Sequence, residues 1–144
     1  MYKRSHVVIL LVSMSLLFIA AGCGTKVEHY KPIEECLNNN EYEKAPELVK
    51  EARSDDSYEE KDRVLYYLDL GITNHYANNY SKSNENLEKA EKNMQELYTK
   101  SLTNKGWSML TNNNELPYYG EEYENIYINV FKALNFVNMD KPDK

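Results

Sequence analysis

Cysteine, glycine and proline are all scarce in this chain of 144 residues. Two Cys are too few for a disulfide framework, and five Gly with four Pro exclude a collagen-like or linker-like composition. Basic residues are also in deficit, with 17 Lys and Arg against 23 Asp and Glu. Because contacts to phosphate need Lys and Arg, we expect no nucleic-acid partner. The length fits one domain.

Motifs that carry catalysis or bind cofactors are missing as well. The chain contains no HExxH, CxxC, GxSxG, GxGxxG or P-loop pattern. A metal site needs clustered ligands, whereas His29 and His75 fall in different predicted helices. The acidic pairs at 55–56, 59–60 and 121–122 are predicted to begin helices, where negative charge complements the helix dipole. We therefore predict no catalytic residue, no metal and no cofactor.

The N-terminal segment has the composition of a targeting sequence. Lys3 and Arg4 precede an apolar run over residues 7–21 that only two serines interrupt. As a helix this run spans about 22 Å, which is shorter than the roughly 30 Å core of a bilayer. The proportions are typical of a signal peptide rather than a transmembrane helix. The remaining chain then carries 15 of the 17 basic residues and all 23 acidic ones, which gives it a net charge of −8.

The apolar run ends in Ala20-Ala21-Gly22-Cys23, which resembles the bacterial lipobox, although Ala20 replaces the preferred Leu. The resemblance implies a signal peptide over residues 1–22 and lipidation of Cys23, which anchors the chain to a membrane of the bacterial cell envelope. Because residue 24 is Gly rather than Asp, it implies the periplasmic face of the outer membrane if the organism is Gram-negative. The alternative is an ordinary secretory signal beside a chance Cys.

Apolar residues recur three and four apart in the rest of the chain, which predicts an all-α fold. Ser57 and Glu60 have capping-box spacing, so we expect a helix from Ser57 to about Asn78. A second helix is predicted over residues 81–100, after a turn at Asn78-Asn79. Its apolar stripe is Leu87, Ala90, Met94 and Leu97.

This pair of helices resembles a tetratricopeptide repeat, which is a helical hairpin of fixed sequence pattern. The residues that carry the resemblance are Tyr67, Leu70-Gly71, Tyr80, Ser83, Leu87 and Ala90. Asn74 departs from the aromatic residue usual at its place, and the closing Pro is absent. A glycine inside a helix costs about 1 kcal/mol relative to alanine, so we expect Gly71 to serve close packing of the two helices.

The same pattern occurs once upstream and begins a third time near Tyr123. Tyr42, Ala45 and Val49 have the spacing of Tyr80, Ser83 and Leu87, and Cys36 is then predicted to be a small core residue rather than a reactive thiol. The predicted organisation is an α-solenoid that ends inside a third hairpin: hairpins over 27–54 and 57–101, an insert over 102–120, and an unpaired helix over 121–138.

Residues 62–137 also resemble a family of uncharacterised bacterial lipoproteins with tetratricopeptide-like repeats. The insert block makes this likeness specific, through Leu110-Thr111-Asn112, Asn114, Leu116-Pro117-Tyr118 and Gly120-Glu121. The members are longer, so the resemblance implies that this chain is an N-terminal portion, from a truncated gene or a disrupted reading frame. No activity follows from the resemblance.

Two groups of residues are candidates for binding. Asp69, His75 and Tyr76 share the face that lines the concave groove of tetratricopeptide proteins, although His75 also suits a helix end that contacts the insert. Asn112, Asn114 and Tyr118 in the insert loop have groups that hydrogen-bond and stack on glycan or peptide, although such amides also satisfy turns.

Two functions from different classes follow. The first is a lipid-anchored adaptor that binds an envelope protein or peptide and catalyses nothing. The second is a glycan-binding or cell-wall accessory protein that uses the insert loop. A truncated gene product without function of its own is the third option.

The lipid anchor is testable at a single atom, because only the Cys23 sulfur can accept the diacylglycerol. We expect Cys23→Ala to move the tagged protein out of the membrane fraction of the cells. Cys36→Ala is the matched control and should stay with the membranes. Unchanged fractionation of Cys23→Ala would contradict lipidation at this site.

Overall fold

The computed structural model describes residues 28–103 and 117–139. The predicted signal peptide, Cys23, most of the insert expected over 102–120, and two of the loop candidates, Asn112 and Asn114, lie outside these ranges. The chain divides into two compact units, residues 1–30 and 31–144, and nearly all of the described residues belong to the second.

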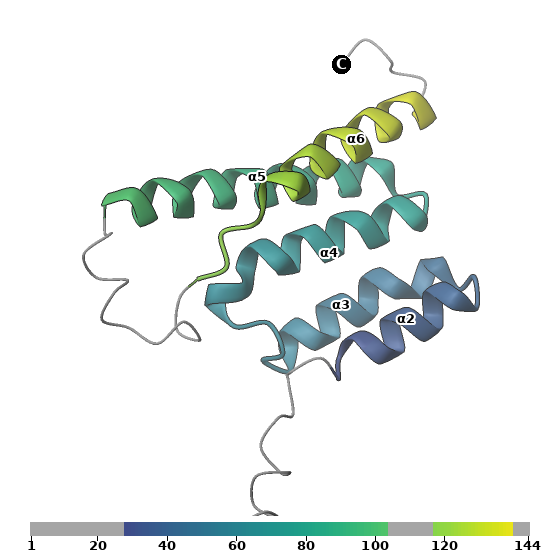
Figure 1. The fold of residues 1–144 in the computed structure, drawn as a ribbon. Helices are drawn as coiled ribbons and strands as arrows, with labels where there is room; N and C mark the ends of the chain where they lie inside the picture. The colour runs from purple at the N-terminus through teal and green to yellow at the C-terminus, as the bar shows by residue number, and fades with distance from the viewer. Residues whose placement is uncertain (1–27, 104–116, 140–144) are drawn as a thin grey trace, which may run out of the picture. The chain divides into compact units, whose positions relative to one another are not determined.

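Helices account for the regular structure of the described residues, which contain no strand, so the predicted all-α class is confirmed. The described residues form five α-helices, and short turns join the first four of them. Two of these turns contain a 3₁₀ segment, η1 (Tyr42–Lys44) and η2 (Glu60–Asp62). The α-helices are α2 (Tyr30–Asn38), α3 (Ala45–Ser54), α4 (Arg63–Tyr76), α5 (Tyr80–Thr103) and α6 (Glu122–Asn138). Figure 1 shows α4 and α5 as an antiparallel pair, with α6 against α5.

Three of the helices end in the same hydrogen-bonded motif. After α2, α3 and α4 the chain takes a left-handed residue, at Asn40, Asp56 and Asn78 respectively. In each case the next backbone N–H donates to a carbonyl five residues earlier, for example Asn79 N to Asn74 O at 2.9 Å. This is the Schellman arrangement, which Asn and Asp tolerate because their side chains can hydrogen-bond locally. The turn predicted at Asn78 is confirmed.

The same motif explains why the predicted start of α4 was wrong. Ser57 does not cap a helix, because its backbone N–H donates to Ala52 O at 2.9 Å and closes the end of α3. The capping box is formed instead by Glu59 and Asp62, and α4 begins at Arg63. Asp55 is likewise the C-cap of α3, so the acidic pair at 55–56 ends a helix rather than beginning one.

Helices α4 and α5 pack closely at Gly71, as expected from the glycine at this position. A Cβ atom on Gly71 would lie 2.7 Å from Leu87 Cδ2 and 2.8 Å from its Cγ. Beside it, the fully buried Ser83 donates its hydroxyl proton to Gly71 O at 2.8 Å. The predicted apolar stripe of α5 is buried here, in a core that consists of Val64, Leu68, Leu87, Ala90, Met94, Leu97 and Ile128.

The likeness between the two hairpins appears in the contacts as well as in the sequence. Tyr42 donates its hydroxyl to Asn40 Oδ1 at 2.7 Å, and at the equivalent place Tyr80 donates to Asn78 Oδ1 at 2.6 Å. Cys36 is buried as predicted, and its thiol donates to Glu41 O. The first hairpin lacks the glycine, because Ile33 takes the place of Gly71.

Adding a side chain at Gly71 should therefore separate α4 from α5. We expect Gly71→Leu to lower the free energy of unfolding by about 1–3 kcal/mol through overpacking against Leu87. Urea denaturation followed by helical circular dichroism measures this change. Glu88→Leu, on the exposed face of α5, is the control and should stay within about 0.5 kcal/mol of wild type. An unchanged denaturation midpoint for Gly71→Leu would contradict the described contact.

Candidate functional site

An apolar groove runs between α4 and α6. Its volume is about 300 Å³, which is the lower limit of pockets that hold small ligands. Leu65, Ile72 and Tyr127 are only partly covered, and each contributes to its walls. The remaining lining residues are Leu68, Asp69, Leu87, Tyr123, Glu124, Ile128 and Phe131. A groove of this size and composition suits apolar side chains of a peptide better than a charged ligand.

Both carboxylates of the groove accept hydrogen bonds from tyrosines. Tyr58 is buried and donates its hydroxyl to Asp69 Oδ2 at 2.7 Å, while Tyr118 donates to Glu124 Oε2. Partial burial, and then this bond to Glu124, raise the pKa of Tyr118 well above its ordinary value. Neither carboxylate is therefore positioned as a free base, and the groove offers shape rather than acid–base chemistry.

The segment before α6 is fixed to the hairpin at two points. Tyr118 N donates to Lys61 O at 2.9 Å, which ties the segment to η2. Gly120 has a φ of +82°, and a Cβ there would overlap Met94 Cε, so only glycine fits this approach to α5. These contacts position the first turn of α6, and with it the Tyr123 side of the groove.

A buried polar network holds the other end of α6. Asn135 is fully buried, and its amide group donates to Ser83 Oγ at 2.8 Å and to Asn84 Oδ1 at 2.7 Å. Its Oδ1 lies 2.6 Å from His75 Nδ1. Because Ser83 gives its single proton to the Gly71 carbonyl, Asn135 must donate to Ser83, and His75 must then carry its proton on Nδ1.

The structure brings only one of the three predicted groove residues to the groove. Asp69 lines it, but His75 points into the Asn135 network and packs edge-on against Phe131, with ring centroids 4.9 Å apart. Tyr76 stacks on Tyr42 from η1, with ring centroids 5.9 Å apart, and is 45% exposed.

The residues that form the α6 wall of the groove are not among those predicted from the sequence. Tyr127 and Phe131 line it from α6, and Asn135 in the same helix closes the polar network. Asn135 is buried and lies seven residues, or two helical turns, after the buried Ile128. This spacing along one helix face is the sequence signal that could have identified Asn135 as a buried residue. An asparagine in such a stripe is easily taken for a surface residue.

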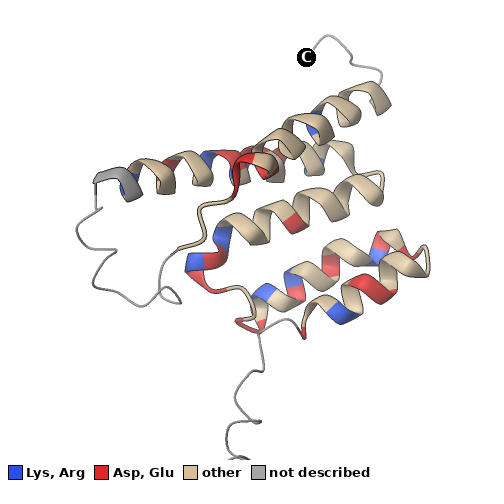
Figure 2. Cartoon of the chain, viewed as in Figure 1, with Lys and Arg blue, Asp and Glu red and all other residues tan. Residues whose placement is uncertain are grey.

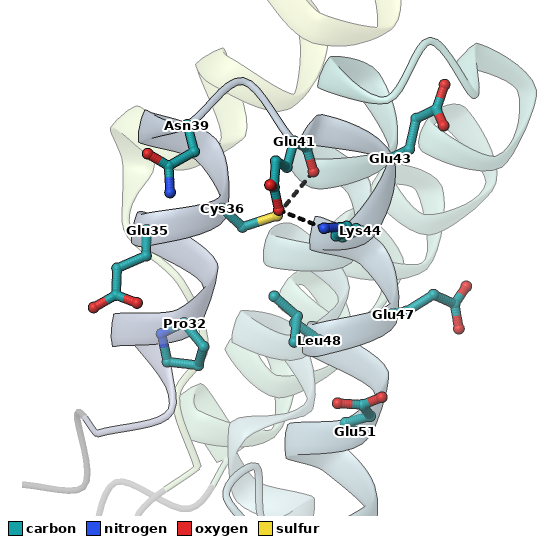
Figure 3. A pocket seen from close by; sticks show the side chains of 10 residues that line it. All are labelled: Pro32, Glu35, Cys36, Asn39, Glu41, Glu43, Lys44, Glu47, Leu48 and Glu51. Atoms are coloured by element: carbon teal, nitrogen blue, oxygen red, sulfur yellow. Dashed lines mark hydrogen bonds and ion pairs between the residues drawn. The ribbon is translucent and has the colours of Figure 1, made fainter.

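A second hollow lies between α2 and α3, with a volume of about 620 Å³ (Figure 3). Ile33, which stands where Gly71 stands in the other hairpin, is buried. Cys36 points into the hollow, and its rim carries five glutamates, of which Glu41 pairs with Lys44 at 2.6 Å. Within the described ranges, no three His, Cys, Asp or Glu residues are grouped to hold a metal ion.

Comparison with family models, curated proteins and solved structures gives no match to this chain. Across residues 28–103 and 117–139, no helix has the length and apolar character needed to cross a bilayer. The candidate site is therefore defined by its own geometry: an apolar groove whose α6 wall is held by the Asn135 network.

Removing the Asn135 amide should release α6 from the hairpin. We expect Asn135→Ala to lower the free energy of unfolding by about 2–4 kcal/mol, because the partly buried His75 Nδ1 and the buried Asn84 Oδ1 lose their partner. Asn129→Ala is the control in the same helix, since Asn129 is exposed, and it should change stability by about 0.5 kcal/mol or less. Thermal and urea denaturation give both values. Equal stability of the two variants would contradict the network.

Proposed function

We propose that this chain is a lipid-anchored helical-repeat protein of the bacterial cell envelope, which binds a protein or peptide partner and catalyses no reaction. The observation that carries the binding role is the groove between α4 and α6, with its partly exposed apolar walls. Apolar grooves between helices are a common seat for a partner's helix or extended segment. The partner would place bulky apolar side chains between Ile72 and Tyr127.

The proposed anchor rests on the sequence around Cys23. A short apolar run, small residues at 20–22 and the Cys that follows them stand in the register of a lipobox. Lipidation supplies more than one acyl chain, which is enough for stable attachment to a membrane. The outer membrane is the proposed location if the organism is Gram-negative.

The proposed tetratricopeptide-like arrangement is supported by contacts that occur at equivalent places in both hairpins. The hydrogen bond from Tyr42 to Asn40 recurs as that from Tyr80 to Asn78, and Ala45 and Ser83 are buried at equivalent places. Repeats of this kind present extended grooves and need no catalytic residue.

The glycan-binding alternative receives less support. Of its three candidate residues only Tyr118 is described, and its hydroxyl group is engaged with Glu124. The neighbouring Tyr119 is half exposed, and it lines a separate hollow with Gln95, Glu121 and Asn125, to which Tyr118 does not contribute. We therefore favour protein or peptide binding in the groove.

Photo-cross-linking in the native bacterial host tests the groove. A photoreactive phenylalanine analogue at Leu65, in the α4 wall, should yield one discrete adduct above the mass of the chain. The same analogue at Lys92, which is exposed on α5, is the matched control and should yield none. Ile72→Asp in the same chain should abolish the Leu65 adduct, because a carboxylate in an apolar wall opposes burial of an apolar partner. Equal adducts from both positions, or none from Leu65, would contradict the proposal.

A further inference from the structure

Among the described residues, one face of α6 is apolar and exposed. Its members are Tyr123, Ile126, Tyr127, Val130, Ala133, Leu134 and Val137, and each is exposed. They recur three and four apart, so they form one stripe along the helix, about 120° wide. We call this stripe the α6 face. Ile128 and Asn135, which are buried against α5, lie on the opposite side of the helix.

Charge is absent from the middle of this face. Beyond the first turn of α6, Lys132 is the only charged residue of the helix, and it pairs with Glu91 of α5 at 3.2 Å, away from the face. Figure 2 shows the contrast with α2 and α3, where charged residues are frequent. A helix surface that was selected to face water would carry charged side chains.

The α6 face has a covered counterpart in the same fold. Ile126, Val130 and Ala133 have the same spacing as Val64, Leu68 and Gly71 of α4. The three α4 residues are buried by α5, which lies antiparallel to α4 and inserts Leu87 against Gly71. The α6 face therefore has the pattern that accepts an antiparallel helix, with the small Ala133 in the place of the glycine.

The face is also self-complementary about Val130. Its other members form symmetric pairs around this residue: Tyr127 with Ala133, Ile126 with Leu134, and Tyr123 with Val137. Two antiparallel copies of α6 would therefore set each Tyr127 against the small Ala133 of the other copy, as Leu87 is set against Gly71. The acidic first turns would lie at opposite ends of the pair, so they would not repel each other.

We propose that the α6 face is the interface of a homodimer, in which two copies of α6 pack antiparallel around a two-fold axis at Val130. Such isologous interfaces use one self-complementary patch on both subunits. With six large residues about half exposed, each copy offers on the order of 600 Å² of apolar surface. The dimer buries roughly 1,200 Å² in total, the lower limit of specific interfaces, which corresponds to a reversible dimer. This proposal does not rest on the proposed function. Because Tyr123 and Tyr127 also line the groove between α4 and α6, the second copy and a groove-bound partner would compete for these two side chains.

Cysteine cross-linking of the full chain tests the dimer. Val130→Cys places two thiols at the axis, where a short bis-maleimide should convert the chain to a species of twice its mass. Asn129→Cys is the matched control, because it is exposed on the same turn but off the face, and it should give only the background that the wild-type chain gives. Val130 is itself 46% exposed, so its replacement leaves the folded core unchanged.

A second pair of variants tests the register. Ile126→Cys and Leu134→Cys in differently tagged chains should cross-link to each other, since these positions face one another in the antiparallel dimer. Ile126→Cys alone should not cross-link to itself, because the two thiols are then offset by about 12 Å along the helix. Homodimers of Ile126→Cys without the mixed species would overturn the antiparallel register. A monomer at Val130→Cys, or an adduct with a chain of different mass, would overturn the homodimer.

Discussion

The close approach of α4 and α5 at Gly71 is the contact on which the remaining packing depends. Without a Cβ at this position, Leu87 reaches the α4 backbone and Ser83 reaches the Gly71 carbonyl. That hydrogen bond uses the single proton of the Ser83 hydroxyl, so its oxygen is left to accept from Asn135. The missing side chain at Gly71 therefore permits a chain of hydrogen bonds that connects α4, α5 and α6. These polar groups are buried, where leaving one unpaired would be costly.

The apolar groove follows from this connection. Asn135 fixes the C-terminal half of α6, while Gly120 and Tyr118 fix its first turn against α5 and η2. Phe131, between these two points, packs against His75 and forms part of the groove wall. The groove is thus formed by a rigid scaffold, and the proposed peptide binding needs shape and apolar surface rather than reactive groups.

Sequence patterns predict the local part of this structure well. The spacing of Leu87, Ala90 and Met94, the small residue at Gly71 and the turn at Asn78 all depend on neighbours within one hairpin. The predicted start of α4 is wrong because Ser57 suits either the N-cap of a helix or the turn that ends one. In the structure its backbone N–H donates to Ala52 O and closes the end of α3. His75 was placed in the groove by its helix face, but its partner, Asn135, is distant in the sequence, and no local pattern identifies such a pair.

The tautomer of His75 tests the central claim most directly. The Gly71 carbonyl oxygen can only accept a hydrogen bond, so the Ser83 hydroxyl must donate to it. The amide group of Asn135 then donates to Ser83 Oγ, and Asn135 Oδ1 is left to accept a hydrogen bond from His75 Nδ1. A long-range ¹H–¹⁵N correlation spectrum distinguishes the two ring nitrogens of the neutral imidazole. The account predicts that His75 carries its proton on Nδ1, in slow exchange with water. A proton on Nε2, with Nδ1 unprotonated, would contradict the network that joins α6 to the hairpin.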